Sequence, residues 1–97
     1  MEFIVRYKID ENKKEAAAAV RHDFFASLNE TPDPQLRYRS LRLADGVSFV
    51  HLAWFQNEEA KERFFANPGF KKFSEGLRSI AVEGPEAMEM TEVAATV

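Results

Sequence analysis

The sequence has 97 residues, a net charge of −3, no cysteine, and 12% aromatic residues with nine phenylalanines among them. This length predicts one domain, residues 1–97. The acidic balance argues against electrostatic binding of nucleic acid, and the lack of cysteine excludes disulfides, thiol catalysis and cysteine metal sites. No apolar stretch approaches the ~18–20 residues that span a bilayer, and the chain does not begin with a basic region followed by an apolar run. We therefore expect a cytoplasmic protein that binds neither membranes nor nucleic acid.

The first third of the chain predicts a strand and then a helix. Apolar residues alternate over 2–9, which is the period of a strand. Residues 12–29 contain four consecutive alanines and neither Gly nor Pro, which favours a helix. Asp10 or Asn12 can cap this helix, and Asn12 with Glu15 has the capping-box spacing. The helix should bury a stripe made of Ala17, Val20, Phe24, Phe25 and Leu28.

A β-hairpin is predicted over residues 36–55, with Asp45-Gly46 as its tight turn. A two-residue turn pairs Ser40 with His51. One face of the hairpin then carries Tyr38, Ser40, Arg42, Phe49 and His51, and the other carries Arg37, Arg39, Leu41, Val50, Leu52 and Trp54. A three-residue turn with a bulge would shift the register by one residue and regroup both faces.

The last part of the chain predicts a broken helical arm and a final strand. Asn57 is suited to cap the first half of the arm, and Asn67-Pro68 has the pattern of a fresh helix start. Gly84-Pro85 should end the arm. Residues 86–96 alternate loosely and predict a last strand, although glutamates at every third position are a rival helical signal.

This order of elements predicts an α+β fold, the ferredoxin-like βαββαβ plait, with an antiparallel four-stranded sheet. Right-handed crossovers place both helices on one face of the sheet. The other face would still expose alternating apolar side chains, which usually marks a partner surface. Two such sheets packed face to face would form a homodimer, a dimeric α+β barrel.

Three segments carry a resemblance to a known family. They are Tyr38-Arg-Ser-Leu-Arg-Leu-Ala-Asp-Gly-Val-Ser-Phe-Val-His51, Asn57-Glu-Glu-Ala60 and Asn67-Pro-Gly-Phe-Lys-Lys-Phe73. With the element order, they resemble the dimeric α+β-barrel superfamily, and within it the antibiotic-biosynthesis-monooxygenase-like proteins. The resemblance implies a homodimer with a ligand cleft between sheet and helices. Some members oxygenate polycyclic phenols without a cofactor, so no cofactor is expected. Others cleave haem with a first-strand Asn, where this chain has Arg6 and Tyr7, so haem cleavage is not expected.

Candidate site residues come mainly from the hairpin. His51 could act as a general base because an imidazole titrates near neutral pH, and Tyr38 could assist it. Residues that could bind a small aromatic substrate are Tyr7, Arg42, Phe49 and Trp54. The alternative for His51 is a buried imidazole that is hydrogen-bonded to Ser40 or Tyr38. His22 is not spaced to share a metal with His51, so no metal site is expected.

Three functions remain open from the sequence. The first is a cofactor-independent monooxygenase that binds a small aromatic molecule between sheet and helices. The second is a non-catalytic binding or regulatory module, and the third is a structural dimerisation domain. A fold alone does not choose among them. A cavity filled by phenylalanine side chains would favour the non-catalytic module.

Overall fold

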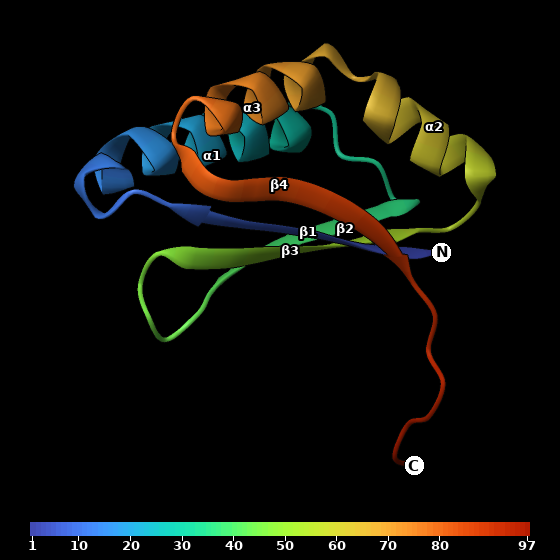
Figure 1. The fold of residues 1–97 in the computed structure, drawn as a ribbon. Helices are drawn as coiled ribbons and strands as arrows, with labels where there is room; N and C mark the ends of the chain where they lie inside the picture. The colour runs from blue at the N-terminus through green and yellow to red at the C-terminus, as the bar shows by residue number, and fades with distance from the viewer.

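The computed structural model describes all residues, 1–97, and contains one antiparallel sheet with three α-helices on one of its faces (Figure 1). The strands are β1 (Glu2–Ile9), β2 (Leu36–Arg42), β3 (Ser48–Phe55) and β4 (Ala81–Met90). The helices are α1 (Lys14–Glu30), α2 (Glu58–Ala66) and α3 (Pro68–Arg78), and a short 3-10 turn, η1 (Glu11–Lys13), precedes α1.

The sheet has the strand order β2-β3-β1-β4, and every neighbouring pair is antiparallel. This is the ferredoxin-like plait that the sequence predicts. The hairpin register is also confirmed, because Ser40 pairs with His51 and Arg37 pairs with Trp54. The alternative register, shifted by one residue, is excluded. Strands β2 and β4 are the two edges of the sheet.

The hairpin connection differs from the predicted two-residue turn, because Leu43 and Ser48 form the last bonded pair and the turn runs from Leu43 to Gly46, with Ala44 and Asp45 at its centre. The Gly46 amide donates to the Leu43 carbonyl at 3.0 Å, and Gly46 has a φ of 78°, a conformation that glycine adopts at little cost. The Asp45 carboxylate accepts from the Ser48 hydroxyl and from the amides of Val47 and Ser48. These bonds, the one from the Ser48 hydroxyl first, lower the pKa of Asp45 to about 2. The turn residues therefore fix the strand register locally.

Helix starts follow the asparagine signals in the second half of the chain. The Asn57 side chain accepts from the Ala60 amide at 2.9 Å, and the Asn67 side chain accepts from the Gly69 amide at 2.8 Å. The first helix differs from its prediction, because Asp10 caps η1 and no side chain caps α1. The expected capping box of Asn12 and Glu15 does not form.

The last strand begins earlier than predicted. It covers Ala81–Met90 in place of 86–96, and α3 ends at Arg78, before Gly84-Pro85. Gly84 has a φ of 75° and lies where the register between β4 and β1 shifts. A Cβ atom at Gly84 would lie 2.5 Å from the Arg6 carbonyl oxygen. Gly84 therefore permits a close backbone approach inside a strand, and the prediction that it ends the helical arm is wrong.

The core lies between the sheet and the helices. It contains fourteen buried apolar residues. The opposite sheet face carries no helix (Figure 1). Apolar side chains of that uncovered face come from all four strands and are Ile4, Leu41, Val50, Leu52, Trp54, Met88 and Met90.

Candidate functional site

His51 is the one polar residue of the buried interior, with 0% of its surface exposed. It lies on β3, whose alternate residues face the helices, and the neighbouring strands place hydroxyl groups around it. Tyr7 comes from β1, whereas Tyr38 and Ser40 come from β2. The period of two in each strand therefore directs four polar side chains into one apolar layer.

Both imidazole nitrogens of His51 are hydrogen-bonded. Nε2 lies 2.9 Å from the Tyr7 hydroxyl and 2.9 Å from the Ser40 hydroxyl, and Nδ1 lies 2.9 Å from the Tyr38 hydroxyl. The Tyr7 oxygen also accepts from Arg21 Nη1 at 3.5 Å. Because Tyr7 accepts there, we assign its proton to the bond with Nε2 and the imidazole proton to Nδ1, which donates to Tyr38. We call these five residues the His51 network.

Arg21 is the only charged member of the His51 network. It reaches down from α1, and its guanidinium carbon lies 4.5 Å from the centroid of the Phe49 ring. The Phe49 ring in turn stacks on Tyr7, with 5.3 Å between centroids. A guanidinium over an aromatic face is favourable, so Phe49 helps to hold Arg21 at the Tyr7 oxygen.

Burial keeps the imidazole and the two phenols of the His51 network uncharged. Desolvation, with a smaller contribution from the Arg21 charge, lowers the pKa of His51 to about 3. Desolvation also raises the pKa of Tyr38. It raises the pKa of Tyr7, against the opposing hydrogen bond and charge of Arg21. At neutral pH the imidazole is therefore uncharged and both phenols are protonated.

Aromatic rings fill the space around the imidazole. The Phe73 ring of α3 is stacked against His51 at 5.4 Å between centroids and 25° between planes. Phe25 of α1 contacts the imidazole edge-on at 6.0 Å, and Phe24 stacks on Phe73 at 4.6 Å. The interior beside His51 is thus packed with phenyl rings. This is the feature that the sequence analysis associates with a non-catalytic module.

The structure divides the predicted site residues between two faces. Tyr7, Tyr38, Phe49 and His51 lie together on the helix side. Trp54 lies on the uncovered face, with the Arg37 guanidinium 5.8 Å from its ring. The two faces are separated by the sheet, so a substrate at His51 would not contact Trp54.

Arg42 lies apart from the His51 network, whereas Arg21 and Phe73 contact it. Arg42 is exposed at the end of β2 and pairs with Phe49 in the sheet, but it makes no hydrogen bond to the network. Sequence reasoning missed Arg21, although it follows buried Ala17 by four residues and so lies on the same side of α1. It also did not place Phe73 of α3 against His51.

A small hollow reaches the His51 network from the side of β2. It has a volume of about 140 Å³ and lies between the end of α1 and the start of β2. Tyr38 and Phe25 belong both to its lining and to the immediate surroundings of His51. Its volume is below the ~300–1,000 Å³ of typical small-molecule sites, so a larger ligand requires side-chain movement.

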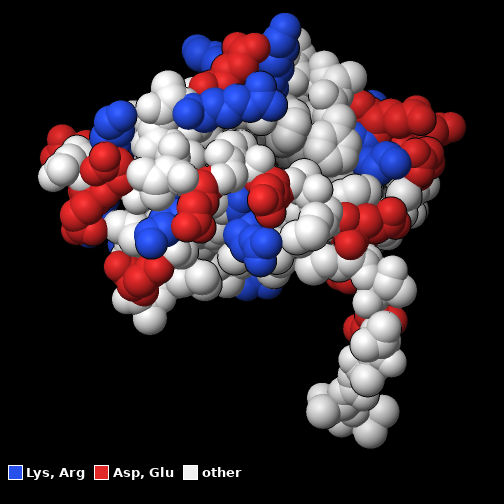
Figure 2. All heavy atoms as spheres, in the orientation of Figure 1, with Lys and Arg blue, Asp and Glu red and all other residues white.

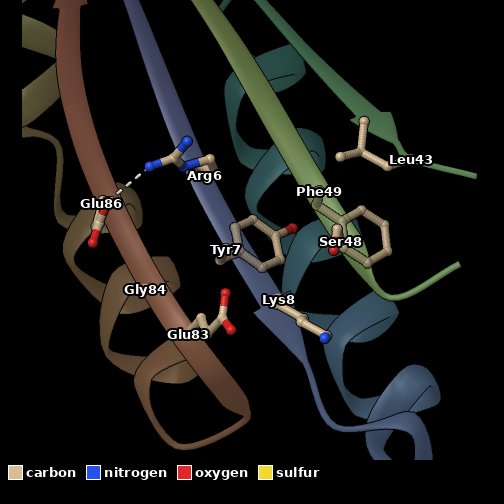
Figure 3. A pocket seen from close by; sticks show the side chains of 9 residues that line it. All are labelled: Arg6, Tyr7, Lys8, Leu43, Ser48, Phe49, Glu83, Gly84 and Glu86. Atoms are coloured by element: carbon tan, nitrogen blue, oxygen red, sulfur yellow. Dashed lines mark hydrogen bonds and ion pairs between the residues drawn. The ribbon is translucent and has the colours of Figure 1, made fainter. Parts of the chain in front are cut away.

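A larger hollow lies elsewhere, where β1 runs between β3 and β4 (Figure 3). It has a volume of about 370 Å³ and is lined by both basic and acidic side chains. Figure 3 shows the Arg6 guanidinium directed at Glu86, at a distance of 3.3 Å. This mixture of charges suits a polar surface better than a pocket for a neutral aromatic molecule.

Three further observations concern metal binding, membrane spanning and surface charge. No group of three or more His, Asp and Glu side chains is arranged to hold a metal ion. None of the helices combines the length with the apolar character that a membrane span requires. Figure 2 shows acidic and basic side chains interspersed over the face that it presents.

Sequence comparison gives no relative, since no protein family and no curated protein matches the chain. Structure comparison does. A protein from Bacteroides thetaiotaomicron named as an antibiotic biosynthesis monooxygenase superposes with a TM-score of 0.80 at 19% identity, covering 100% of this chain and 92% of that chain. The present chain has the antibiotic biosynthesis monooxygenase fold.

Two other solved structures with the antibiotic biosynthesis monooxygenase fold extend this likeness. One, from Nitrosomonas europaea and named in the same way, gives a TM-score of 0.78 at 16% identity, covering 96% of this chain and 98% of that one. SnoaB from Streptomyces nogalater, a cofactor-independent oxygenase, gives 0.69 at 21% identity, covering 95% and 93%. At these identities the likeness shows the shared fold.

Proposed function

We propose that this protein is a homodimeric, cofactor-independent monooxygenase that acts on a small electron-rich aromatic molecule. The observation that carries the proposal is the uncharged imidazole of His51 bonded to the phenols of Tyr7 and Tyr38, buried among aromatic rings on a fold shared with the oxygenase SnoaB. Hydroxyl and imidazole groups that both donate and accept can move protons without a change in net charge. The network therefore offers proton transfer in a site from which water is excluded.

Proton transfer through the network runs from Tyr7 to Tyr38 by way of His51. Tyr38 gives its proton to an oxygen atom of the ligand beside it, while Nδ1 gives its proton to Tyr38 and Tyr7 gives its own to Nε2. The imidazole exchanges one neutral tautomer for the other, so the imidazolium that its pKa of about 3 disfavours need not form. Arg21 stabilises negative charge at the Tyr7 end.

The oxygen chemistry needs no group beyond the substrate and O2. An ionised phenol with an activated methylene group is electron-rich and can transfer electrons to O2. The methylene carbon becomes a carbonyl carbon, one oxygen atom enters the product and the other leaves as water. The substrate supplies all four electrons that O2 accepts. The protein contributes the proton path and a dry, shaped site.

The ligand would enter through the hollow beside Tyr38. Tyr38 lines this hollow and bonds His51 Nδ1, so a ligand there contacts the network without reaching the imidazole directly. The volume of about 140 Å³ requires Phe25 or Tyr38 to move before a polycyclic molecule fits. Tyr38 is accordingly the catalytic residue of the proposal, and His51 and Tyr7 complete its proton path.

The test is oxygen transfer from 18O2 to a panel of polycyclic phenols with an activated methylene, in buffer free of added cofactors. The proposal expects substrate-dependent O2 uptake and one 18O atom in the carbonyl product. Tyr38→Phe should lower the rate about 100-fold or more, the usual size of a general acid–base contribution. Glu59→Gln, on the exposed side of α2, is the matched control and should not change it. A rate equal to that of buffer alone would contradict the proposal.

The homodimer is proposed from the uncovered sheet face. Apolar side chains of all four strands meet there, and charged residues border them, which is the composition of a protein interface. A second sheet packed on this face would remove it from water. Leu52 and Trp54 lie on the inner strand β3 and would be central to the contact.

A non-catalytic binding or dimerisation module is the second candidate, and one observation favours it. Phe73 stacks directly on His51, and the imidazole has no exposed surface, so the network could serve only to satisfy buried polar groups. In that case phenolic ligands should leave the NMR signals of Tyr38 and His51 unchanged. Ligand-dependent shifts at both residues would favour the monooxygenase.

A further inference from the structure

We propose that the groove between helices α1 and α3 is a binding site for a small aromatic α-amino acid. The ring of the ligand packs against Phe24 and Phe73, its ammonium group pairs with Asp23, and its carboxylate pairs with Lys72. The groove is separate from the hollow beside Tyr38 and from the uncovered sheet face. The inference therefore goes beyond the proposed monooxygenase and does not depend on it.

The α1–α3 groove has a volume of about 260 Å³, and its lining comes from the two helices alone. Its floor is formed by the buried rings of Phe24 and Phe73, which stack at 4.6 Å between centroids. An aromatic floor with a few polar groups around it is the usual composition of a small-molecule site. The volume is just below the ~300 Å³ of the smallest typical sites, so the groove suits a ligand with one ring and not a polycyclic molecule.

Two glycine contacts define how α1 and α3 pack around this groove. A Cβ atom at Gly69 would lie 3.0 Å from Ser27 Oγ, and a Cβ atom at Gly76 would lie 3.1 Å from Val20 Cγ1. The start of α3 is therefore beside the later part of α1, and the end of α3 is beside an earlier part of α1. The two helices run antiparallel, and the groove lies between these two points of close approach.

The antiparallel packing places one acidic and one basic side chain at the same level of the groove. Asp23 directly precedes Phe24 on α1, and Lys72 directly precedes Phe73 on α3. Because Phe24 and Phe73 stack on each other, the two charged residues lie less than one helical turn apart along the helix axes. Each belongs to a different helix, so the groove has an acidic wall and a basic wall.

These two charges select the chemical class of the ligand. Asp23 and Lys72 are exposed, and neither forms an ion pair in the structure. A ligand with only a carboxylate would be repelled by Asp23, and a ligand with only an amine would be repelled by Lys72. An α-amino acid carries both charges at neutral pH and complements both side chains.

Ser27 adds a polar group on the α1 side of the groove. Its hydroxyl donates to the Phe24 carbonyl at 2.8 Å, so the hydroxyl proton is already used. The Ser27 oxygen still has acceptor capacity and can accept from an ammonium group bound at Asp23. The α1 wall therefore favours the ammonium end of the ligand, and the carboxylate end faces α3.

The test is an NMR titration of the 15N-labelled protein with three compounds that share one phenyl ring. They are L-phenylalanine, 3-phenylpropionate, which lacks the ammonium group, and phenethylamine, which lacks the carboxylate. L-phenylalanine at millimolar concentrations should cause saturable shifts at the amides of Gly69 and Gly76. Each analogue should bind about three- to five-fold more weakly, the usual effect of losing one solvent-exposed ion pair.

Two variants assign the charges to their partners. Lys72→Gln should bind L-phenylalanine no more tightly than phenethylamine, and Asp23→Asn should bind it no more tightly than 3-phenylpropionate. Lys71→Gln is the matched control, because Lys71 is exposed on α3 but does not line the groove, and it should bind like the parent. All three substitutions replace exposed side chains, so the fold should be maintained.

Three results would overturn the inference. They are the absence of saturable shifts, shifts confined to residues outside α1 and α3, and equal affinities for the three compounds. A loss of affinity in Lys71→Gln as large as that in Lys72→Gln would also overturn it, since net charge and not the groove would then decide binding. No turnover is measured, so a protein that binds L-phenylalanine in this way but oxygenates no phenol would support the inference and contradict only the monooxygenase.

Discussion

The Phe73 ring of α3 lies nearly parallel to the His51 imidazole, 5.4 Å away between centroids. This stacking closes the space between the sheet and the helices directly above the buried histidine. It also connects the stability of the core to access to the His51 network, because the same ring fills the site and supports the packing of α3. Replacing this ring therefore tests both the stability of the core and access to the His51 network.

Phe73→Ala should lower the free energy of unfolding by about 3–5 kcal/mol, the usual cost of removing a buried phenyl ring. The vacated space lies against His51, so phenol should bind there and restore part of the lost stability. Thermal unfolding with and without phenol measures both effects. Leu77→Ala, also fully buried on α3, is the control. Equal stabilisation of the two variants by phenol would contradict a ring-shaped space at His51.

The low pKa of His51 predicts a stability change between about pH 6.5 and pH 3. The unfolded chain binds a proton at His51 in this range, and the folded chain does not. The free energy of unfolding should therefore fall as the pH decreases below 6.5, by up to about 1.4 kcal/mol per pH unit from this residue. Urea unfolding at a series of pH values measures the slope.

His51→Gln isolates the histidine contribution from that of the carboxylates, which also titrate in this range. The variant should be less stable than the parent at pH 7, because Gln fits the hydrogen bonds of the network imperfectly. Its stability should nevertheless decrease less steeply with falling pH. Parallel slopes for the parent and the variant would show that His51 keeps an ordinary pKa in the folded protein.

Gly84→Ala should lower the free energy of unfolding by more than about 2 kcal/mol. The new Cβ would clash with the Arg6 carbonyl oxygen, and alanine would also have to adopt a positive φ. Gly46→Ala is a matched control. It has a similar φ of 78°, but the nearest atom to its new Cβ is Lys14 Nζ at 3.7 Å. Gly46→Ala should lower the free energy of unfolding by only about 1 kcal/mol. If chemical denaturation gave similar losses of unfolding free energy for both variants, the backbone clash at Gly84 would be excluded.

Leu52→Asp should weaken the proposed dimer, because it places a carboxylate in the middle of the uncovered sheet face. The side chain points away from the helices, so the fold of the single chain should be maintained. Sedimentation velocity should show the variant as a single chain at concentrations at which the parent is dimeric. Circular dichroism checks that the fold remains. An unchanged dimer would place the interface on another surface.

The hairpin and the helix starts could be predicted from sequence because their signals are local. Asp45-Gly46 sets the turn, the period of two sets the faces, and Asn57 and Asn67 cap the helices that follow them. The pairing of Ser40 with His51 was predicted from a two-residue turn, and the observed turn from Leu43 to Gly46 keeps the same pairing.

The features that were missed depend on contacts between distant segments. Gly84 has the local pattern of a helix end, but its conformation is decided by the approach of β4 to the Arg6 backbone. The stacking of Phe73 on His51 depends on how closely α3 packs on α1. Gly76 permits this packing, because a Cβ there would lie 3.1 Å from the Val20 side chain. A short-range sequence pattern predicts neither the approach of β4 to the Arg6 backbone nor the approach of α3 to α1.

The candidate site did not follow the register that the sequence itself predicted. That register placed Trp54 on the face opposite His51, yet Trp54 was included among the candidate substrate residues. The structure confirms the register, and Arg42 lies at an exposed strand end. Composition identifies the residue types of a site, whereas strand register decides which of them can touch one ligand.

Native mass spectrometry of freshly purified protein tests the central claim, that the uncovered sheet face is closed by a second copy of the chain. One chain has a mass of 11.1 kDa, so we expect a species of about 22 kDa at micromolar concentration. Any retained small molecule would add its own mass in the same spectrum. A protein that stays at 11.1 kDa under these conditions would contradict the account.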